Sequence, residues 1–165
     1  MRVAFGSDHA GFVLKEQLMA EVTAMGHEAI DLGTFDGTTS VDYPDFGAAV
    51  GRSVAGGDAD LGVCTCGTGI GIAMAANKVA GIRAAVVHDV TTATLARQHN
   101  HANVVCLGAR TTGPAVATDA LRAFFDATEE HGRHDGRIAK LTELDGELAH
   151  ASANVDRAER SEGIA

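Results

Sequence analysis

The stretch DLGVCTCGTGIGIAMAANKVA, residues 60–80, contains the arrangement that decides the fold. Residues 60–65 form a mainly apolar run typical of a buried β-strand, and residues 69–80 favour a helix. Gly67, Gly69 and Gly71 occupy the turn between the two elements. A strand that passes through a tight turn into a helix is the repeating unit of parallel sheets. The stretch therefore predicts an α/β fold.

The same alternation extends on both sides of this stretch. Leu14, Leu18, Val22 and Met25 recur at helical spacing before Gly26. Continuous apolar runs, typical of strands buried on both faces, predict a mainly parallel sheet covered by helices on both sides. Besides 60–65, we expect strands at 2–6, 28–32, 83–87 and 103–107, and helices at 44–55, from Asp89 to about His99, and from Pro114 onward.

Length and composition favour one globular domain. The chain has 165 residues, of which 45% are hydrophobic and 21% charged. We expect a single domain over residues 1–150, including a last helix from about 137 to 149. Residues 151–165 have no apolar stripe, and we expect a flexible tail there.

The charge and cysteine content exclude several classes of protein. The net charge of −9 and the aromatic content of 4% disfavour nucleic-acid and anionic-membrane binding. The sequence contains no apolar run long enough to span a membrane, and its N-terminus lacks a signal-peptide pattern. The 3 cysteines are an odd number, which indicates reduced thiols in a cytoplasmic protein.

Parallel sheets bind ligands beyond the carboxyl ends of their strands. The segment 66–71, Cys-Gly-Thr-Gly-Ile-Gly, lies at such an end. Its backbone N–H groups and the following helix would bind an anion and favour the thiolate form of Cys66. A thiolate beside N–H donors is suited to moving a proton next to a carbonyl. A glycine-rich turn with a merely buried cysteine is an equally open interpretation.

Other candidate residues each have a structural alternative. His99, with Asn100, is expected at a helix end, where it could act as an acid or base or simply face the helix dipole. Asp8 could be a catalytic carboxylate or a helix cap. Arg110, Arg133 and Arg137 could bind a phosphate or lie in solvent. Cys64 and Cys66 are too close in sequence for a zinc-finger pair, so we expect no metal.

Five ordered stretches together resemble one family. They are GSDHAGFVLK (6–15), DYPDFG (42–47), CGTGIGIAMAANKVAGIRAA (66–85), RQHNHANVVCLGAR (97–110) and GRHDGR (132–137). They are similar to the type B ribose-5-phosphate isomerases, whose family includes the galactose-6-phosphate isomerase subunits.

The resemblance implies a Rossmann-like three-layer α/β/α sandwich with a five-stranded parallel sheet. It also implies an enzyme of the pentose phosphate pathway that interconverts ribose 5-phosphate and ribulose 5-phosphate through a cis-enediolate. The family uses neither a metal nor an organic cofactor. It forms homodimers with shared active sites, or tetramers built from them.

The resemblance also implies roles for individual residues. Cys66 matches the catalytic base, and Thr68 the loop that binds the enediolate. His99 matches the acid and base of ring opening, opposite the glycine loop, and Asp8 assists at the sugar hydroxyls. The remaining substrate-binding positions are His9, Tyr43, Gly67, Gly69, Ile70, Gly71, Asn100, Arg110, Arg133, His134 and Arg137.

Departures from the family pattern leave alternatives open. One subclass has a glutamate base where this chain has Ile70, so Cys66 assigns the chain to the cysteine subclass. His131 replaces the first glycine of the usual Gly-Gly-Arg-His, and the C-terminal tail is longer than usual. The substrate could be allose 6-phosphate, galactose 6-phosphate or a tetrulose phosphate. A noncatalytic sugar-phosphate or nucleotide-binding module would need the glycine loop and arginines, but not Cys66 and His99 together.

Overall fold

The computed structural model describes residues 1–146. The chain divides into two compact units, Met1–Glu130 and His131–Ala165. The predicted boundary at residue 150 and the predicted tail, 151–165, lie outside the described residues. Among residues 1–146, no helix combines the length and apolar character that crossing a bilayer requires.

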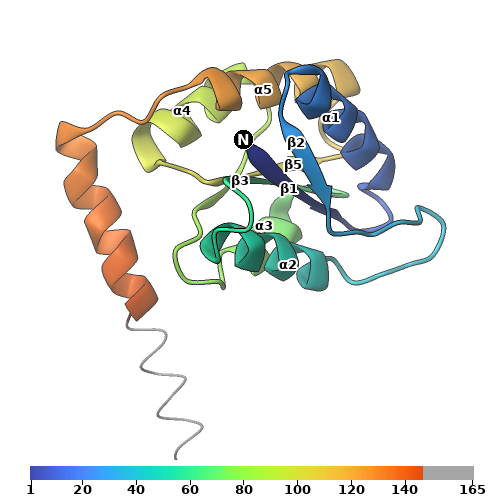
Figure 1. Cartoon of the computed structure of the whole chain (residues 1–165), viewed down its shortest axis with the longest axis horizontal. Coiled ribbons are helices and arrows are strands. Elements are labelled where there is room, and N and C mark those ends of the chain that lie inside the picture. Colours follow the sequence, from blue (N-terminus) through green and yellow to red (C-terminus); the bar gives the residue numbers. More distant parts are fainter. Residues whose placement is uncertain (147–165) are drawn as a thin grey trace, which may run out of the picture. The chain divides into compact units, whose positions relative to one another are not determined.

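The first unit contains a five-stranded sheet in which all neighbouring strands are parallel, as predicted. The strand order is β2-β1-β3-β5-β4. Along the chain (Figure 1), the elements are β1 (Arg2–Ser7), α1 (Phe12–Ala24), β2 (Glu28–Asp31), α2 (Tyr43–Ala55), β3 (Leu61–Cys66), α3 (Ile70–Ala76), β4 (Ala84–Val86), α4 (Val90–Asn100), β5 (Val104–Gly108) and α5 (Pro114–Asp126).

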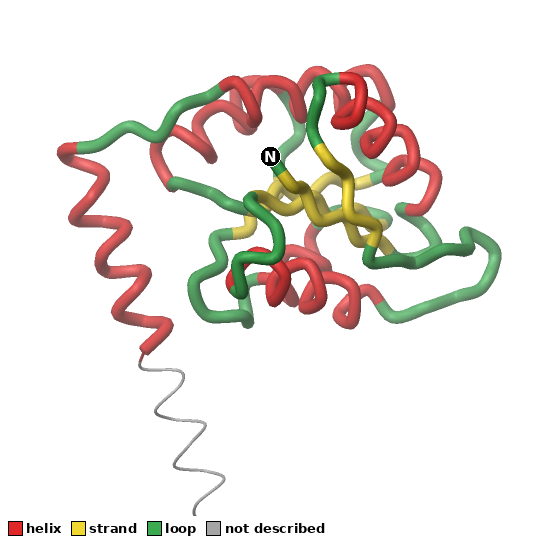
Figure 2. The backbone as a smooth tube through the Cα atoms, viewed as in Figure 1, coloured by secondary structure: helices red, strands yellow, loops and turns green. Residues whose placement is uncertain are grey.

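The helices cover both faces of the sheet and form the predicted three layers. Helices α1, α4 and α5 lie on one face, and α2 and α3 lie on the other (Figures 1 and 2). Successive side chains of a strand point to opposite faces, so each strand contributes to two cores. In β1, Val3 and Phe5 pack in the core under α1, α4 and α5, whereas Ala4 packs in the core over α2 and α3. The continuous apolar runs follow from this burial on both faces.

Side-chain hydrogen bonds set two helix boundaries. The Asp89 carboxylate accepts from the Thr92 N–H (2.7 Å) in a capping box, which confirms the predicted start of α4. Helix α3 ends at Ala76, although the sequence predicts a helix to residue 80. The Asn77 side chain bonds both backbone groups of Ala84, accepting at 2.7 Å and donating at 2.8 Å. Asn77 thus ends the helix early and fixes the start of β4.

In the second unit, a 3₁₀ turn at Gly132–His134 leads into a helix that covers residues 135–146. The Asp135 carboxylate accepts from the Gly132 N–H (2.8 Å) and pairs with His131 Nδ1 (3.0 Å). These bonds close the turn before the helix, which begins two residues earlier than predicted.

Candidate active site

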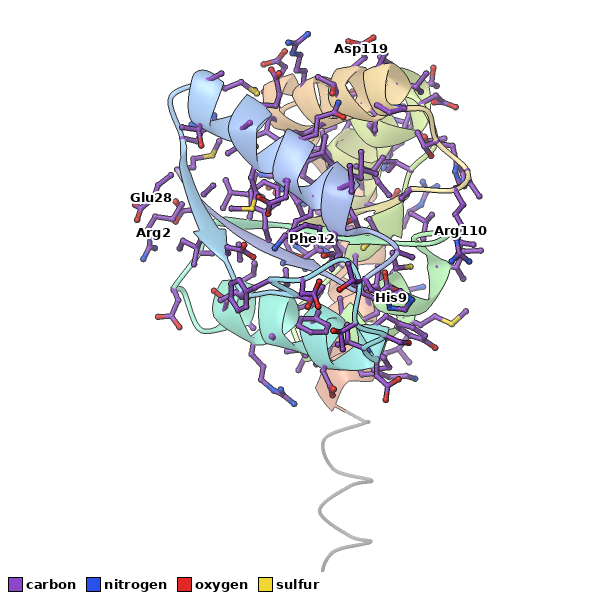
Figure 3. The ribbon with its side chains drawn as sticks, turned by 90° about the vertical axis from the view of Figure 1, so that its right-hand side faces the viewer. Arg2, His9, Phe12, Glu28, Arg110 and Asp119 are labelled. Atoms are coloured by element: carbon purple, nitrogen blue, oxygen red, sulfur yellow. The ribbon has the colours of Figure 1, made fainter. Side chains whose placement is uncertain are left out.

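The turn after β1 and the glycine loop after β3 lie side by side, because strands β1 and β3 are neighbours in the sheet. β2 lies on one side of β1 and β3 on the other, so the sheet order reverses at this point. A crevice forms outside the carboxyl ends of the strands at such a position. Figure 3 shows Arg2 and Glu28, where strands begin, on one side of the sheet, and His9 and Arg110, beyond strand ends, on the other. Asp8 follows β1, and Cys66 is the last residue of β3.

Gly11 allows the turn after β1 to pack directly on the end of β3. A side chain at Gly11 would collide with the backbone of Thr65 and Cys66. The Thr65 hydroxyl donates to the Gly11 carbonyl (2.9 Å), and the Gly11 N–H donates to the buried Asp8 carboxylate (2.9 Å). These contacts hold the Asp8 carboxylate beside the strand end that carries Cys66.

The glycine loop wraps its backbone around the Cys66 sulfur. Gly69 has a φ of 78°, a left-handed conformation that favours glycine. Its N–H donates to Cys66 Sγ (3.1 Å). An N–H donor stabilises negative charge on sulfur more than it stabilises a neutral thiol. The Gly69 N–H is therefore directed at the Cys66 sulfur, the atom to which the sequence analysis gives a role in proton transfer.

The other two cysteines have a different environment. Cys64 and Cys106 are paired on neighbouring strands, and all three cysteines are free thiols, as predicted. The hydrogen bond with Cys64, together with complete burial, raises the pKa of the Cys106 thiol well above its usual value. Cys106 is therefore a neutral core residue, whereas Cys66 reaches the glycine loop.

Residues from two other segments line the glycine loop. The Tyr43 ring packs against Gly71, and the Arg110 side chain passes over Gly67. The Arg110 N–H also donates to the Gly67 carbonyl (2.9 Å), which ties the loop after β5 to the loop after β3. Within the loop, the Ile70 N–H donates to the Thr68 hydroxyl (3.3 Å).

His9 receives its orientation from the segment between β2 and α2. The Val41 N–H donates to His9 Nδ1 (3.2 Å), so the proton of the neutral ring lies on Nε2. Lys15, which is fully buried, anchors the start of this segment. Its ammonium donates to both Asp31 carboxylate oxygens (2.6 and 2.7 Å) and to the Thr34 carbonyl (2.7 Å).

His99 and Asn100 lie at the opposite edge of the sheet from Cys66. Helix α4 ends at Asn100, shortly before β5 begins, and the Gly62 N–H near the start of β3 donates to the Asn103 carbonyl (2.9 Å). Strand β3 has 6 residues, so its length separates the two edges by roughly 17 Å. The expectation that His99 faces the glycine loop does not hold within one chain. A helix that connects parallel strands returns to the edge where the next strand begins.

Arg133, His134 and Arg137 belong to the second compact unit. Arg133 and His134 lie in the 3₁₀ turn, where the Arg133 guanidinium donates to His134 Nε2 (3.1 Å). Arg137 lies in the helix that follows. The turn thus brings the Arg133 and His134 side chains together, and Arg137 follows three residues later in the chain.

Sequence reasoning missed three residues that shape the site. Gly11 and Gly108 permit close backbone approaches, to Thr65 and Thr68 respectively. Isolated glycines after strands are the signal that could have revealed them. Glu130, whose carboxylate lies 3.6 Å from His99 Nε2, had no signal in the sequence because this contact depends on how the end of the first unit folds back.

Three comparisons relate the chain to known proteins. A family model described as Ribose/Galactose Isomerase matches residues 3–141. Ribose-5-phosphate isomerase B of Escherichia coli strain K12 is 43% identical over 144 residues, covering 87% of this chain and 96% of that protein. Galactose-6-phosphate isomerase subunit LacB of Clostridium acetobutylicum is 41% identical over 140 residues, covering 85% of this chain and 80% of that protein.

The fold also matches that of a solved structure. The structure of Clostridium thermocellum ribose-5-phosphate isomerase B matches with a TM-score of 0.87 and 43% identity, covering 89% of this chain and 99% of that chain. The sequence match and the matching fold extend over nearly all the described residues. The chain therefore belongs to the ribose/galactose isomerase family.

Proposed function

We propose that this protein interconverts ribose 5-phosphate and ribulose 5-phosphate, with Cys66 as the base. The observation that carries the proposal is the Cys66 sulfur, held at 3.1 Å by the Gly69 N–H at a strand end. A relative in Escherichia coli is named ribose-5-phosphate isomerase B, and so is the Clostridium thermocellum protein that shares this fold. The protein would act in the cytoplasm in the pentose phosphate pathway, where its thiols stay reduced.

The proposed reaction is a proton transfer between two carbons. The Cys66 thiolate takes the proton from C2 of open-chain ribose 5-phosphate, and the electron pair moves through C1 onto the aldehyde oxygen. The N–H groups of residues 67–71 and the Thr68 hydroxyl stabilise the resulting enediolate oxygen. Cys66 then returns the proton to C1, while the proton of the C2 hydroxyl passes to the C1 oxygen, so that C1 becomes the primary alcohol and C2 the ketone. Asp8 would hold the sugar hydroxyls during these steps.

Phosphate and sugar recognition would use the residues around the loop. His9 and Arg110 would bind the phosphate through charge-assisted hydrogen bonds, together with Arg133, His134 and Arg137. Tyr43, Ile70 and Asn100 would contact the sugar. We expect no requirement for a metal or organic cofactor, because the proton transfer uses only the thiol and hydrogen-bond donors of the loop.

We propose that two chains share each site in a homodimer. His99 and Asn100 lie at the amino edge of the sheet, roughly one strand length from Cys66 of the same chain. A second chain related by a twofold axis would supply His99, Asn100 and the arginines 133 and 137 to the carboxyl edge. The symmetry would give two identical sites for each dimer, whether the dimer stands alone or pairs with a second dimer in a tetramer.

His99→Asn should impair ring opening and leave the enediolate step intact. Ribose 5-phosphate is mainly cyclic, whereas ribulose 5-phosphate is an open chain whose phosphate blocks a furanose ring. We expect a loss of roughly 10²-fold with the cyclic substrate, the usual scale for removing an acid or base. Exchange of the C1 proton of ribulose 5-phosphate with solvent should change less than about threefold by the same reasoning. Equal losses in both assays would contradict this division of roles.

A galactose 6-phosphate substrate is the second candidate, favoured by the 41% identity to the Clostridium acetobutylicum subunit. Purified protein should be assayed with pentose, hexose and tetrose phosphates, allose 6-phosphate and a tetrulose phosphate included, in the presence of a metal chelator. Our proposal predicts the highest kcat/KM for ribose 5-phosphate. A higher kcat/KM for a hexose or tetrose phosphate would identify that sugar phosphate as the substrate instead. Absence of conversion with every sugar phosphate would favour a noncatalytic binding module.

A further inference from the structure

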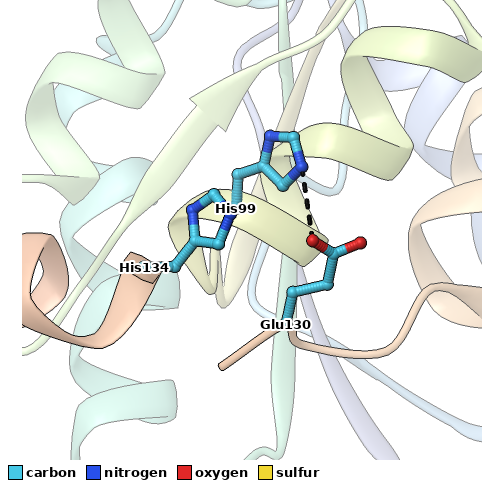
Figure 4. Close-up of side chains that lie close together, drawn as sticks. All are labelled: His99, Glu130 and His134. Atoms are coloured by element: carbon cyan, nitrogen blue, oxygen red, sulfur yellow. Dashed lines mark ion pairs between the residues drawn. The ribbon is translucent and has the colours of Figure 1, made fainter. Parts of the chain in front are cut away.

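We propose that Glu130 is a positioning residue for His99, orienting its imidazole and stabilising the imidazolium formed during ring opening. The inference rests on the proposed function, because it concerns the ring-opening step assigned to His99. It assigns a role to a residue whose carboxylate reaches His99 from outside helix α4. Figure 4 shows the ion pair between the two side chains.

The backbone of Glu130 is attached to the end of α4 at two points. Its N–H donates to the carbonyl of Gln98 (2.9 Å). Its own carbonyl lies 2.7 Å from Nε2 of His101, the buried residue that caps α4 in a left-handed conformation with a φ of 47°. Two short contacts on either side of one residue fix the position of its Cα, so the direction of its side chain is set by the fold.

From this fixed position, the Glu130 carboxylate meets the His99 ring. Oε2 of Glu130 lies 3.6 Å from Nε2 of His99, which directs the other ring nitrogen, Nδ1, away from the carboxylate. The adjacent Glu129 has a different contact, because its carboxylate pairs with the Arg97 guanidinium at 2.6 Å. The other Glu129 oxygen lies 3.8 Å from His101 Nδ1, so Glu129 is directed to Arg97 and His101, whereas Glu130 is directed to His99.

The contact between Glu130 and His99 would assist the proton transfers of ring opening. One proton moves from the C1 hydroxyl to the ring oxygen while the bond between C1 and the ring oxygen breaks. His99 relays this proton, so its ring is an imidazolium between the two transfers. A carboxylate at the opposite ring nitrogen stabilises that cation and keeps the ring oriented, as in other histidine–carboxylate pairs.

Glu130→Gln in the full-length protein tests the inference. Glutamine keeps the size and the backbone contacts of Glu130 but removes the charge. For a half-exposed pair we expect conversion of ribose 5-phosphate to slow about fivefold, corresponding to about 1 kcal/mol. Exchange of the C1 proton of ribulose 5-phosphate should stay within about twofold of wild type by the same magnitude. Glu129→Gln is the matched control, since it removes the adjacent charge and should show no difference between the two assays.

A double variant distinguishes positioning from a general structural effect. If Glu130 acts through His99, then His99→Asn/Glu130→Gln should convert ribose 5-phosphate at the rate of His99→Asn alone. Additive losses, or equal losses in both assays for Glu130→Gln, would overturn the inference. If His99→Asn separates the two assays but Glu130→Gln does not, only the inference fails. If wild-type protein converts neither substrate, the proposed function fails, and the role of Glu130 fails with it.

Discussion

Cys66→Ala is expected to lose about 10²- to 10⁴-fold in turnover, the usual range for removing a general base. Alanine leaves the N–H groups of the glycine loop in place but removes the sulfur that the Gly69 N–H contacts at 3.1 Å. The affinity for a phosphorylated substrate analogue should therefore change little. Steady-state kinetics and analogue binding on the same preparation measure the two effects separately.

Cys106→Ala is the matched control for this variant. Its thiol lies in the same core but is neutral and fully buried, with Cys64 as its hydrogen-bond partner. The substitution should lower the free energy of unfolding by about 1 kcal/mol through the small cavity, with turnover within a few-fold of wild type. Near-normal turnover in Cys66→Ala would remove Cys66 from the role of base. A matching loss in Cys106→Ala would attribute the effect to packing.

Mixing two inactive variants should restore about a quarter of wild-type activity. The pair is Cys66→Ala and Arg137→Ala, unfolded together and allowed to reassociate. With random pairing about half the dimers are hybrids, and each hybrid has one intact site of two. The intact site combines Cys66 from one chain with Arg137 from the other, so both parents alone should stay nearly inactive.

The same experiment with His99→Asn in place of Arg137→Ala follows from the topology of the sheet. His99 lies at the amino edge, so a hybrid with Cys66→Ala should also regain activity toward cyclic substrate. A Cys66→Ala/Arg137→Ala double variant mixed with either parent is the control, because no pairing can assemble an intact site. If both variants stay defective at every mixing ratio, each site is built within one chain and the shared-site proposal is wrong.

The sheet could be predicted from sequence because its strands are buried on both faces. β3, Leu61–Cys66, is buried at every position and appears as an uninterrupted run. The strand order was not predictable from such runs, since β5 lies between β3 and β4 although it follows both in sequence. The end of α3 was missed for a local reason, because the Asn77 side chain binds Ala84, eight positions beyond Ala76.

The candidate site likewise contains residues that the sequence could predict and residues that it could not. Residues at the carboxyl ends of strands, such as Asp8 and Cys66, were predictable because parallel strands place these ends at one edge of the sheet. To predict the position of His99, the direction of α4 had to be taken into account, because this helix runs back toward the amino edge of the sheet. Glu130 depends on the return of the chain after α5 and has no periodicity or motif that reveals it.

Conversion of ribose 5-phosphate in D₂O, with metal chelated and the reaction followed to equilibrium, tests the central claim most directly. A proton carried by the Cys66 thiol exchanges with solvent, so repeated passage through the enediolate should introduce deuterium at C1 of ribulose 5-phosphate and at C2 of ribose 5-phosphate. NMR detects both positions, and Cys66→Ala should slow conversion and labelling together by about 10²- to 10⁴-fold. Conversion that reaches equilibrium without deuterium at either carbon would contradict proton transfer through an enediolate, and so would labelling that persists undiminished in Cys66→Ala.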